Sequence, residues 1–260
     1  MTVRVIVHAD DFGLHPAINA GIEAAHRDGL VTSASLMPLG PAFADALRRA
    51  QALPALDLGL HFTLVGVPDL PPNLGAFLSA YTRGLFPARV VEDHLRRQSR
   101  ALGSLSISHI DSHQHLHALP GLMRVVCRYA AEQDIPAVRL PVDGPAFGPV
   151  SASRRVQAAM LAAMSRLSRR YMTAYGLRTS DYFFGMAVSG HLTPPTLTAY
   201  LQSAKPGLTE IVCHPGLDNS TLREVFDWDY DWQGEAAALC SGAARMAVQD
   251  RGIVLTGWQK

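Results

Sequence analysis

The stretch "VRVIVHADDFG", residues 3–13, sets the fold that this sequence predicts. Its first part, residues 3–9, is rich in β-branched side chains and predicts a buried strand. Asp10 and Asp11 follow directly, and Asp-Asp-Phe-Gly is a sequence typical of a turn. Residues 16–29 then predict a helix. A strand, a turn and a helix in this order indicate the repeating unit of a parallel α/β sheet.

The same alternation continues along the chain. Further strands are expected at residues 34–38, 56–64, 107–111, 137–141, 209–216 and 253–257. Further helices are expected at residues 42–53, 88–103, 120–134, 154–176 and 234–252. Residues 66–87 are rich in proline and glycine and predict a long loop. Because no fixed-period repeat or low-complexity segment divides the chain, residues 1–260 are predicted to form one domain.

Composition excludes several classes of protein. The formal net charge is +1 and no lysine or arginine block is present, so no nucleic-acid partner is expected. No run of about 18 apolar residues occurs, which argues against a membrane span. The apolar run at the N-terminus is too short for a signal peptide. The three cysteines are far apart and form no CxxC motif, so we expect neither a disulfide framework nor a zinc knuckle. A cytoplasmic protein is therefore predicted.

Polar side chains recur where the predicted strands end. In parallel α/β folds such residues meet at one rim, where active sites form. Five strands contributing to one rim indicate a closed or nearly closed (β/α) barrel rather than an open sheet, and the number of helices leaves room for a distorted or seven-stranded one. The residues concerned are Asp10, Asp11, His61, His113, Arg139 and His214.

The segment "HIDSHQHLH", residues 109–117, holds four of the 11 histidines. In a strand, alternate residues share a face, so every ionisable group here would lie on one side. A nonamer is too long for all of them to reach one ion. We therefore expect His113, nearest the strand end, to join a metal site, and His115 and His117 to lie in the loop beyond, near substrate. The alternative is that these histidines are hydrogen-bonded loop and core residues.

Each remaining candidate has an alternative explanation. The adjacent carboxylates could be one metal ligand and one free base, or only a turn. His61 is the lone polar group of an apolar strand and could be structural. His214 suits a general acid or a substrate contact, whereas a dyad with Cys213 is disfavoured because neighbours in a strand face opposite ways. Arg139 could contact substrate oxygens or pair with a carboxylate.

In their order and spacing, "ADDFG", "GLH", "HIDSHQHLH" and "EIVCHPG" resemble the YdjC-like carbohydrate deacetylases, which include the chitooligosaccharide deacetylases called ChbG. The resemblance runs nearly end to end and is weakest in residues 66–87 and 142–205. It implies a barrel-like fold with one divalent metal ion, Zn or Mg, held by Asp11, His61 and His113. It also implies that Asp10 is the catalytic base and His214 the acid. Asp111 could orient a histidine ligand.

A finer resemblance concerns "SDYFFGMAVSGHLT" (180–193) and "VTSASLMP" (31–38), which are similar to the hopanoid-associated HpnK branch. It implies an N-acetylglucosaminyl hopanoid as substrate. The helix at 154–176, with apolar and arginine side chains, would then be a lid or a membrane-surface face; core packing is the simpler explanation. Peripheral contact with the inner membrane and a homodimer are consistent with this branch.

Together with this resemblance, the sequence predicts a metal-dependent N-deacetylase that acts on an N-acetylated amino sugar, with an N-acetylglucosaminyl hopanoid lipid as the favoured substrate. Alternatives are a chitooligosaccharide deacetylase, or a phosphoesterase or amidohydrolase with two metal ions. Because the motifs contain no lysine, the two-metal alternative is the weaker one. A metal-storage protein would concentrate its ligands in one tract instead of distributing them over distant strands. A sugar-binding module would more often expose aromatic platforms, whereas only 7% of the residues here are aromatic. Aromatic residues in "DWDYDW", namely Trp228, Tyr230 and Trp232, are candidates for a substrate groove.

Overall fold

A computed structural model describes residues 2–259 of the chain. Its eight strands are all parallel to their neighbours. They are β1 (Val3–Phe12), β2 (Ser33–Leu36), β3 (Asp57–Phe62), β4 (His109–Ser112), β5 (Ala137–Val138), β6 (Tyr182–Phe184), β7 (Gly207–Cys213) and β8 (Val254–Leu255). The spatial order is β5-β4-β3-β2-β1-β7-β6, and β8 pairs with β1 beside this path.

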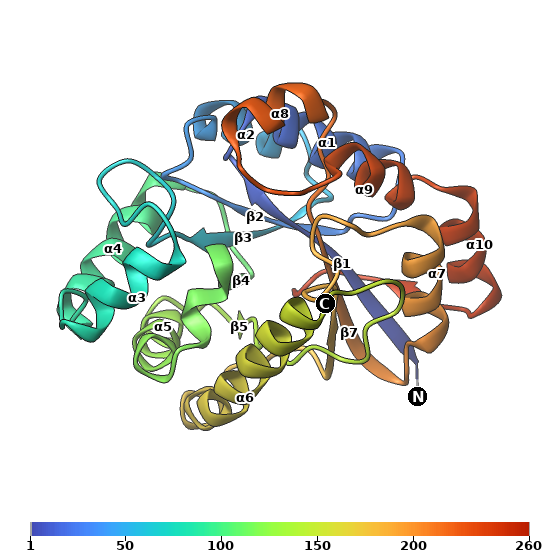
Figure 1. Ribbon diagram of the computed structural model, residues 1–260. Helices are drawn as coiled ribbons and strands as arrows, with labels where there is room; N and C mark the ends of the chain where they lie inside the picture. Colours follow the sequence, from blue (N-terminus) through green and yellow to red (C-terminus); the bar gives the residue numbers. More distant parts are fainter. Residues whose placement is uncertain (1, 260) are drawn as a thin grey trace.

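The seven strands of this path curl into a half-barrel with helices around it (Figure 1). Its two edges come close enough to form two isolated parallel bridges, Ala137 with Arg178 and Asp143 with Phe183. Backbone hydrogen bonds at this seam include Val138 N–H to Arg178 C=O, 3.1 Å, and Gly144 N–H to Phe183 C=O, 2.8 Å. The prediction of a distorted, barrel-like parallel α/β fold is confirmed.

The helices cover the outside of this sheet and bury one face each. They are α1 (Pro16–Arg27), α2 (Phe43–Gln51), α3 (Leu74–Thr82), α4 (Ala88–Ala101), α5 (Pro120–Glu132), α6 (Ala152–Ala174), α7 (Pro194–Ser203), α8 (Asn219–Val225), α9 (Trp232–Leu239) and α10 (Gly242–Asp250), with a 3₁₀ helix at His113–Ala118. In α1, for example, Ile18, Ile22 and Ala25 follow helical spacing and are all buried. Within the described residues, no helix combines the length and the apolar character needed to cross a membrane.

Three predictions of local structure were wrong. The loop expected at residues 66–87 contains α3, whose first turn is capped by the Asn73 side chain accepting from the Ala76 N–H. The helix expected at residues 234–252 is two helices, because Ser241 caps a new helix by accepting from the Ala244 N–H. The predicted first strand stops too early, since β1 continues through both carboxylates to Phe12.

Candidate metal centre

A bulge near the end of β1 separates two adjacent carboxylates. The pairing of β1 with β2 shifts register between Ala9 and Phe12, and Asp11 has a φ of 67°, in the left-handed region. Bulges of this kind re-aim side chains and are frequent beside active sites. Asp tolerates this conformation better than most residues do. Asp10 and Asp11 thus have different partners although both are buried.

Asp11, His61 and His113 converge on one point. Asp11 Oδ1 lies 3.2 Å from His61 Nε2 and 2.8 Å from His113 Nδ1. The three residues come from β1, from β3 and from the turn after β4, and all are buried. Their donor atoms lie within 4.8 Å of one another, close enough to hold one ion. The sequence predicted this set, and the structure brings it together.

The chemistry of these donor atoms fits a divalent cation. His61 Nε2 is buried without a hydrogen-bond partner, although Asp11 lies near it. The opposite nitrogen, Nδ1, lies 2.8 Å from Asp111 Oδ1 and 3.0 Å from Ser35 Oγ. A carboxylate behind a histidine fixes the ring and directs its other nitrogen toward a metal. One oxygen and two nitrogen ligands with room for more are typical of catalytic zinc.

The local charge also favours a cation. Burial opposes the charged form of the His61 ring, but the carboxylates of Asp111, Asp11 and Asp10 outweigh it and raise the pKa of His61 to about 10. Burial likewise opposes ionisation of Asp11, yet His113 and His61 hold the pKa of this carboxyl well below its usual range. The site therefore presents negative charge that a proton or a metal ion can neutralise.

Arg139 organises a second group of charges beside the first. The guanidinium of Arg139 is fully buried and donates to both oxygens of Asp10, at 2.8 and 2.9 Å. It also lies 2.9 Å from Asp111 Oδ2, and its Nε donates to Glu210 at 2.7 Å. Burial opposes ionisation of Asp10, but Arg139 outweighs it and lowers the pKa of Asp10. Of the two roles expected for Arg139, this geometry shows the carboxylate pair.

The other histidines of the 109–117 segment separate after Ser112, where the strand ends. His117 is fully buried, with Nδ1 2.6 Å from Ser112 Oγ and Nε2 2.9 Å from the Arg139 carbonyl oxygen, so both of its ring nitrogens have partners inside the protein. His115 has a φ of 53° and a buried Nδ1 without a partner. His109 lies deeper and stacks on Trp258, with ring centroids 5.2 Å apart. The shared face that was expected for residues 109–117 therefore extends only to Ser112, where β4 ends.

His214 lies across from Asp10 at the end of β7, since Ala9 pairs with Cys213. The His214 backbone N–H donates to the buried Glu235 carboxylate at 2.5 Å, which fixes this end of the strand. The His214 Nδ1 is buried without a partner, and the ring centroid lies 5.4 Å from that of Tyr230. Cys213 instead points to the His8 carbonyl oxygen, 3.2 Å away, as the alternation of a strand requires.

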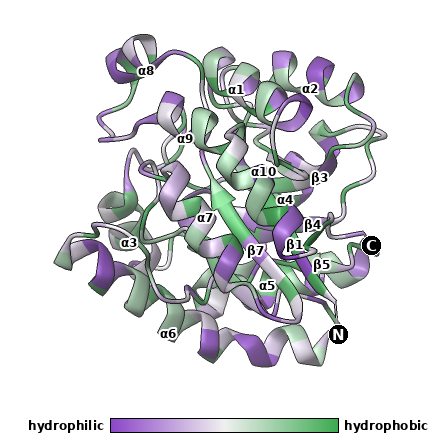
Figure 2. Ribbon diagram, turned by 90° about the vertical axis from the view of Figure 1, so that its right-hand side faces the viewer, coloured by the Kyte–Doolittle hydropathy of each residue, from purple (hydrophilic) through white to green (hydrophobic). Residues whose placement is uncertain are grey.

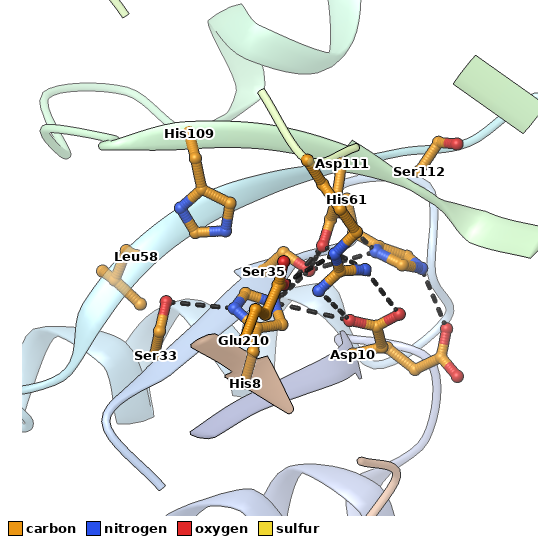
Figure 3. A network of polar contacts seen from close by, with 12 residues as sticks. His8, Asp10, Ser33, Ser35, Leu58, His61, His109, Asp111, Ser112 and Glu210 are labelled. Atoms are coloured by element: carbon orange, nitrogen blue, oxygen red, sulfur yellow. Dashed lines mark hydrogen bonds and ion pairs between the residues drawn. The ribbon is translucent and has the colours of Figure 1, made fainter. Parts of the chain in front are cut away.

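Sequence reasoning missed two buried partners of this network, His8 and Glu210. His8 Nε2 lies 3.4 Å from Asp10 and 3.3 Å from Asp111, and Figure 3 shows its ring to the left of the Asp10 carboxylate. Both residues could have been found from strand alternation, because His8 shares a face with Asp10, and Glu210 shares one with His214.

The profile of the YdjC-like protein family matches residues 4–250 of the chain. This protein belongs to the YdjC-like family. A chitooligosaccharide deacetylase of Klebsiella pneumoniae (strain 342) is 31% identical over 263 residues, covering 96% of each chain. A carbohydrate deacetylase of Brevibacillus brevis is 37% identical over 152 residues, covering 54% of this chain and 60% of that one.

Solved structures support the fold of this YdjC-like protein. The crystal structure of a candidate cellobiose-phosphate cleavage protein from Enterococcus faecalis V583 aligns with a TM-score of 0.76 at 24% identity, over 100% of this chain and 98% of that one. An uncharacterized protein of Agrobacterium tumefaciens C58 aligns with a TM-score of 0.58 at 16% identity, over 98% and 87%. At such identities the likeness concerns the fold alone.

A cleft opens beside the candidate metal centre of this YdjC-like protein. It encloses about 910 Å³ and is lined by His15, Asn73, Gln114, Phe226 and Trp228, among others. The Trp228 ring lies 5.8 Å from that of His113, so the cleft adjoins the cluster. Trp232, in contrast, is fully buried and cannot line a groove. Of the three aromatic residues expected there, Trp228 faces the cleft and Tyr230 lies against His214.

Proposed function

We propose that this YdjC-like protein is a metal-dependent hydrolase that removes acetate from an N-acetylated amino sugar. The observation that carries the proposal is the convergence of Asp11, His61 and His113 beside a separate, ion-paired Asp10. A metal-ligand set with a spare carboxylate next to it is suited to metal-assisted hydrolysis of an amide, in which the carboxylate acts as the base. The family membership, together with relatives named as deacetylases of carbohydrates and chitooligosaccharides, supports this reaction and substrate class.

Asp11, His61 and His113 would hold the ion. When bound, a divalent metal ion supplies a Lewis acid that polarises the acetamide carbonyl and lowers the pKa of water. Two imidazoles favour Zn over Mg by ligand type, and we propose Zn, with Mg as the alternative. Asp111 and Ser35 orient the His61 ring, since they contact Nδ1 and leave Nε2 free for the ion.

Asp10 accepts the proton of the attacking water in this proposal. Arg139 occupies one lone pair on each Asp10 oxygen and keeps the carboxylate ionised. A carboxylate oxygen has a second lone pair, so Asp10 can still accept a proton or a hydrogen bond. Arg139 thus serves to position and ionise the base.

His214 donates the proton that the leaving amine needs. The Nδ1 of this ring has no partner inside the protein, and its backbone is held by Glu235. Among the expected substrate contacts, His115 is the best placed, because its Nδ1 is also without a partner. The polar atoms of His117 and Arg139 are already used within the protein.

The finer substrate is also a proposal. An N-acetylglucosaminyl hopanoid follows from the resemblance to the hopanoid-associated branch, and a chitooligosaccharide is the alternative. The deciding experiment is acetate release by purified protein from each substrate, with and without chelator. Chelator-sensitive release supports the reaction, and the substrate that releases acetate identifies the acceptor. If the protein binds metal but releases acetate from neither substrate, the proposed function is refuted.

We also propose that the protein lies in the cytoplasm, where its free cysteines stay reduced. A homodimer stays a prediction.

Asp10→Asn should retain metal and lose turnover by about 10²- to 10⁴-fold, the usual contribution of a general base. Asn keeps the size of the side chain but does not accept a proton. The measurement is kcat for acetate release beside metal content per chain. If kcat stayed near normal, another group would be the base.

Asp111→Asn should weaken metal binding by about 10- to 100-fold, because the His61 ring loses the carboxylate behind it. Metal affinity is measured by competition with a chelating dye. Ser108→Ala serves as the control, because Ser108 directly precedes the same strand and its side chain contacts His109 rather than His61. Equal metal affinity in the Asp111→Asn variant and the wild type would argue against this role of Asp111.

A further inference from the structure

The outer face of α6 carries a stripe of exposed apolar side chains. Val156, Met160 and Leu167 are 58%, 61% and 65% exposed. At 100° per residue they fall within about 40° of one another around the helix axis. The buried residues of α6, such as Leu161 and Ser165, lie on nearly the opposite side. Single exposed apolar residues need no explanation, whereas an aligned set on one helix does.

Positive charge accompanies this stripe. The 23 residues of α6 include five arginines and no acidic residue. Since the whole chain has a formal net charge of +1, the five arginines leave the rest of the protein at −4. Arg155, Arg166 and Arg170 are exposed, and at 100° per residue all three lie on one flank of the stripe. In both ribbon views α6 lies along the lower edge of the molecule (Figure 1, Figure 2).

We propose that this face of α6 binds the surface of an anionic lipid bilayer. An amphipathic helix with basic side chains beside an apolar stripe lies in the plane of a membrane interface, its apolar stripe among the acyl chains and its cations on lipid phosphates. A second copy of the chain fits less well, because a symmetric contact would bring together two α6 helices that each carry five arginines and no acidic residue. Nucleic acid would leave the apolar stripe exposed to water.

This surface is connected to the candidate metal centre. At the first turn of α6, Arg154 donates to the Ser189 carbonyl oxygen at 2.8 Å, and its guanidinium lies 6.0 Å from the Tyr230 ring centroid. Tyr230 in turn packs against His214. Docking of α6 therefore holds the rim of the site near the lipid surface. If the proposed reaction is correct, this suits a substrate whose sugar is anchored by a lipid.

The test is co-sedimentation of the full-length protein with vesicles of pure phosphatidylcholine or of phosphatidylcholine containing phosphatidylglycerol. We expect binding to the anionic vesicles that declines in high salt. Replacing Arg155, Arg166 and Arg170 with glutamine should weaken it about a hundredfold, and Met160→Ser with Leu167→Ser about tenfold. Met246→Ser and Arg48→Gln change similarly exposed side chains on other helices and should leave binding unchanged.

Failure to bind anionic vesicles at low salt, or binding that the α6 variants do not weaken, would overturn the proposal. Self-association in analytical ultracentrifugation that the same variants abolish would also overturn it, in favour of an interface between copies. Vesicle binding is measured without substrate, so its outcome does not depend on the reaction. Acetate release from a water-soluble sugar should be unchanged in the α6 variants.

Discussion

Replacing His113 with alanine should abolish metal binding and acetate release together. The substitution removes one of the three donor atoms and leaves Asp11 and His61 unable to enclose an ion. A bound metal contributes several kcal/mol to the transition state, and each 1.36 kcal/mol corresponds to about tenfold in rate, so we expect a loss of about a thousandfold or more. Metal content by mass spectrometry and kcat/KM on the same preparation provide the measurement.

His115→Ala is the matched control for this experiment. His115 lies in the same turn after β4 and is also buried, but it belongs to none of the clusters able to hold a metal among the described residues. It should keep its metal even if substrate binding weakens. A His113→Ala protein that retained both metal and turnover would show that the ligand set is wrongly assigned.

Arg139→Met should destabilise the protein by about 3–5 kcal/mol, the range for breaking a buried ion pair. Methionine approximates the length of the side chain but leaves Asp10, Asp111 and Glu210 without their cation, and all three carboxyls are buried. The free energy of unfolding, from denaturant titration at neutral pH in the presence of chelator, gives the size of the loss.

Arg166→Met provides the reference, because Arg166 is exposed on α6, and changes at such positions usually stay within about 0.5 kcal/mol. An Arg139→Met protein as stable as this reference would mean that the three carboxyls do not depend on the guanidinium. In that case the three buried carboxyls would have to be neutralised by bound protons instead of by the guanidinium.

Strand and helix periodicity predicted the parallel fold and most of its elements, because buried strands and amphipathic helices leave strong local patterns. It could not identify β6, which has only three residues, or α3, which depends on one asparagine cap. The predicted end of the first strand, before Asp10 and Asp11, was also wrong. The bulge there depends on pairing with another strand, which a sequence pattern alone does not reveal.

The convergence of the candidate metal ligands was predictable for a different reason. Asp11, His61 and His113 lie at or just beyond the carboxyl ends of the parallel strands β1, β3 and β4, where the fold itself brings distant residues together. The partners of Arg139 were not predictable in the same way. Arg139 pairs with three carboxylates because its side chain is fully buried inside the half-barrel. The sequence around β5 does not reveal this burial.

The seam between β5 and β6 suggests how this scaffold can diversify. The three proposed ligands and Asp10 belong to the continuous stretch β1–β4 and the turn that follows it, whereas the seam is joined by two isolated bridges among the described residues. Residues 142–205 supply both partners of the second bridge, Asp143 and Phe183, and they also include α6 and Arg154, which lies against Tyr230. None of the proposed ligands, the base Asp10 or the acid His214 lies in this segment, so it could exchange whole loops and helices for a new acceptor while the reacting centre keeps its shape.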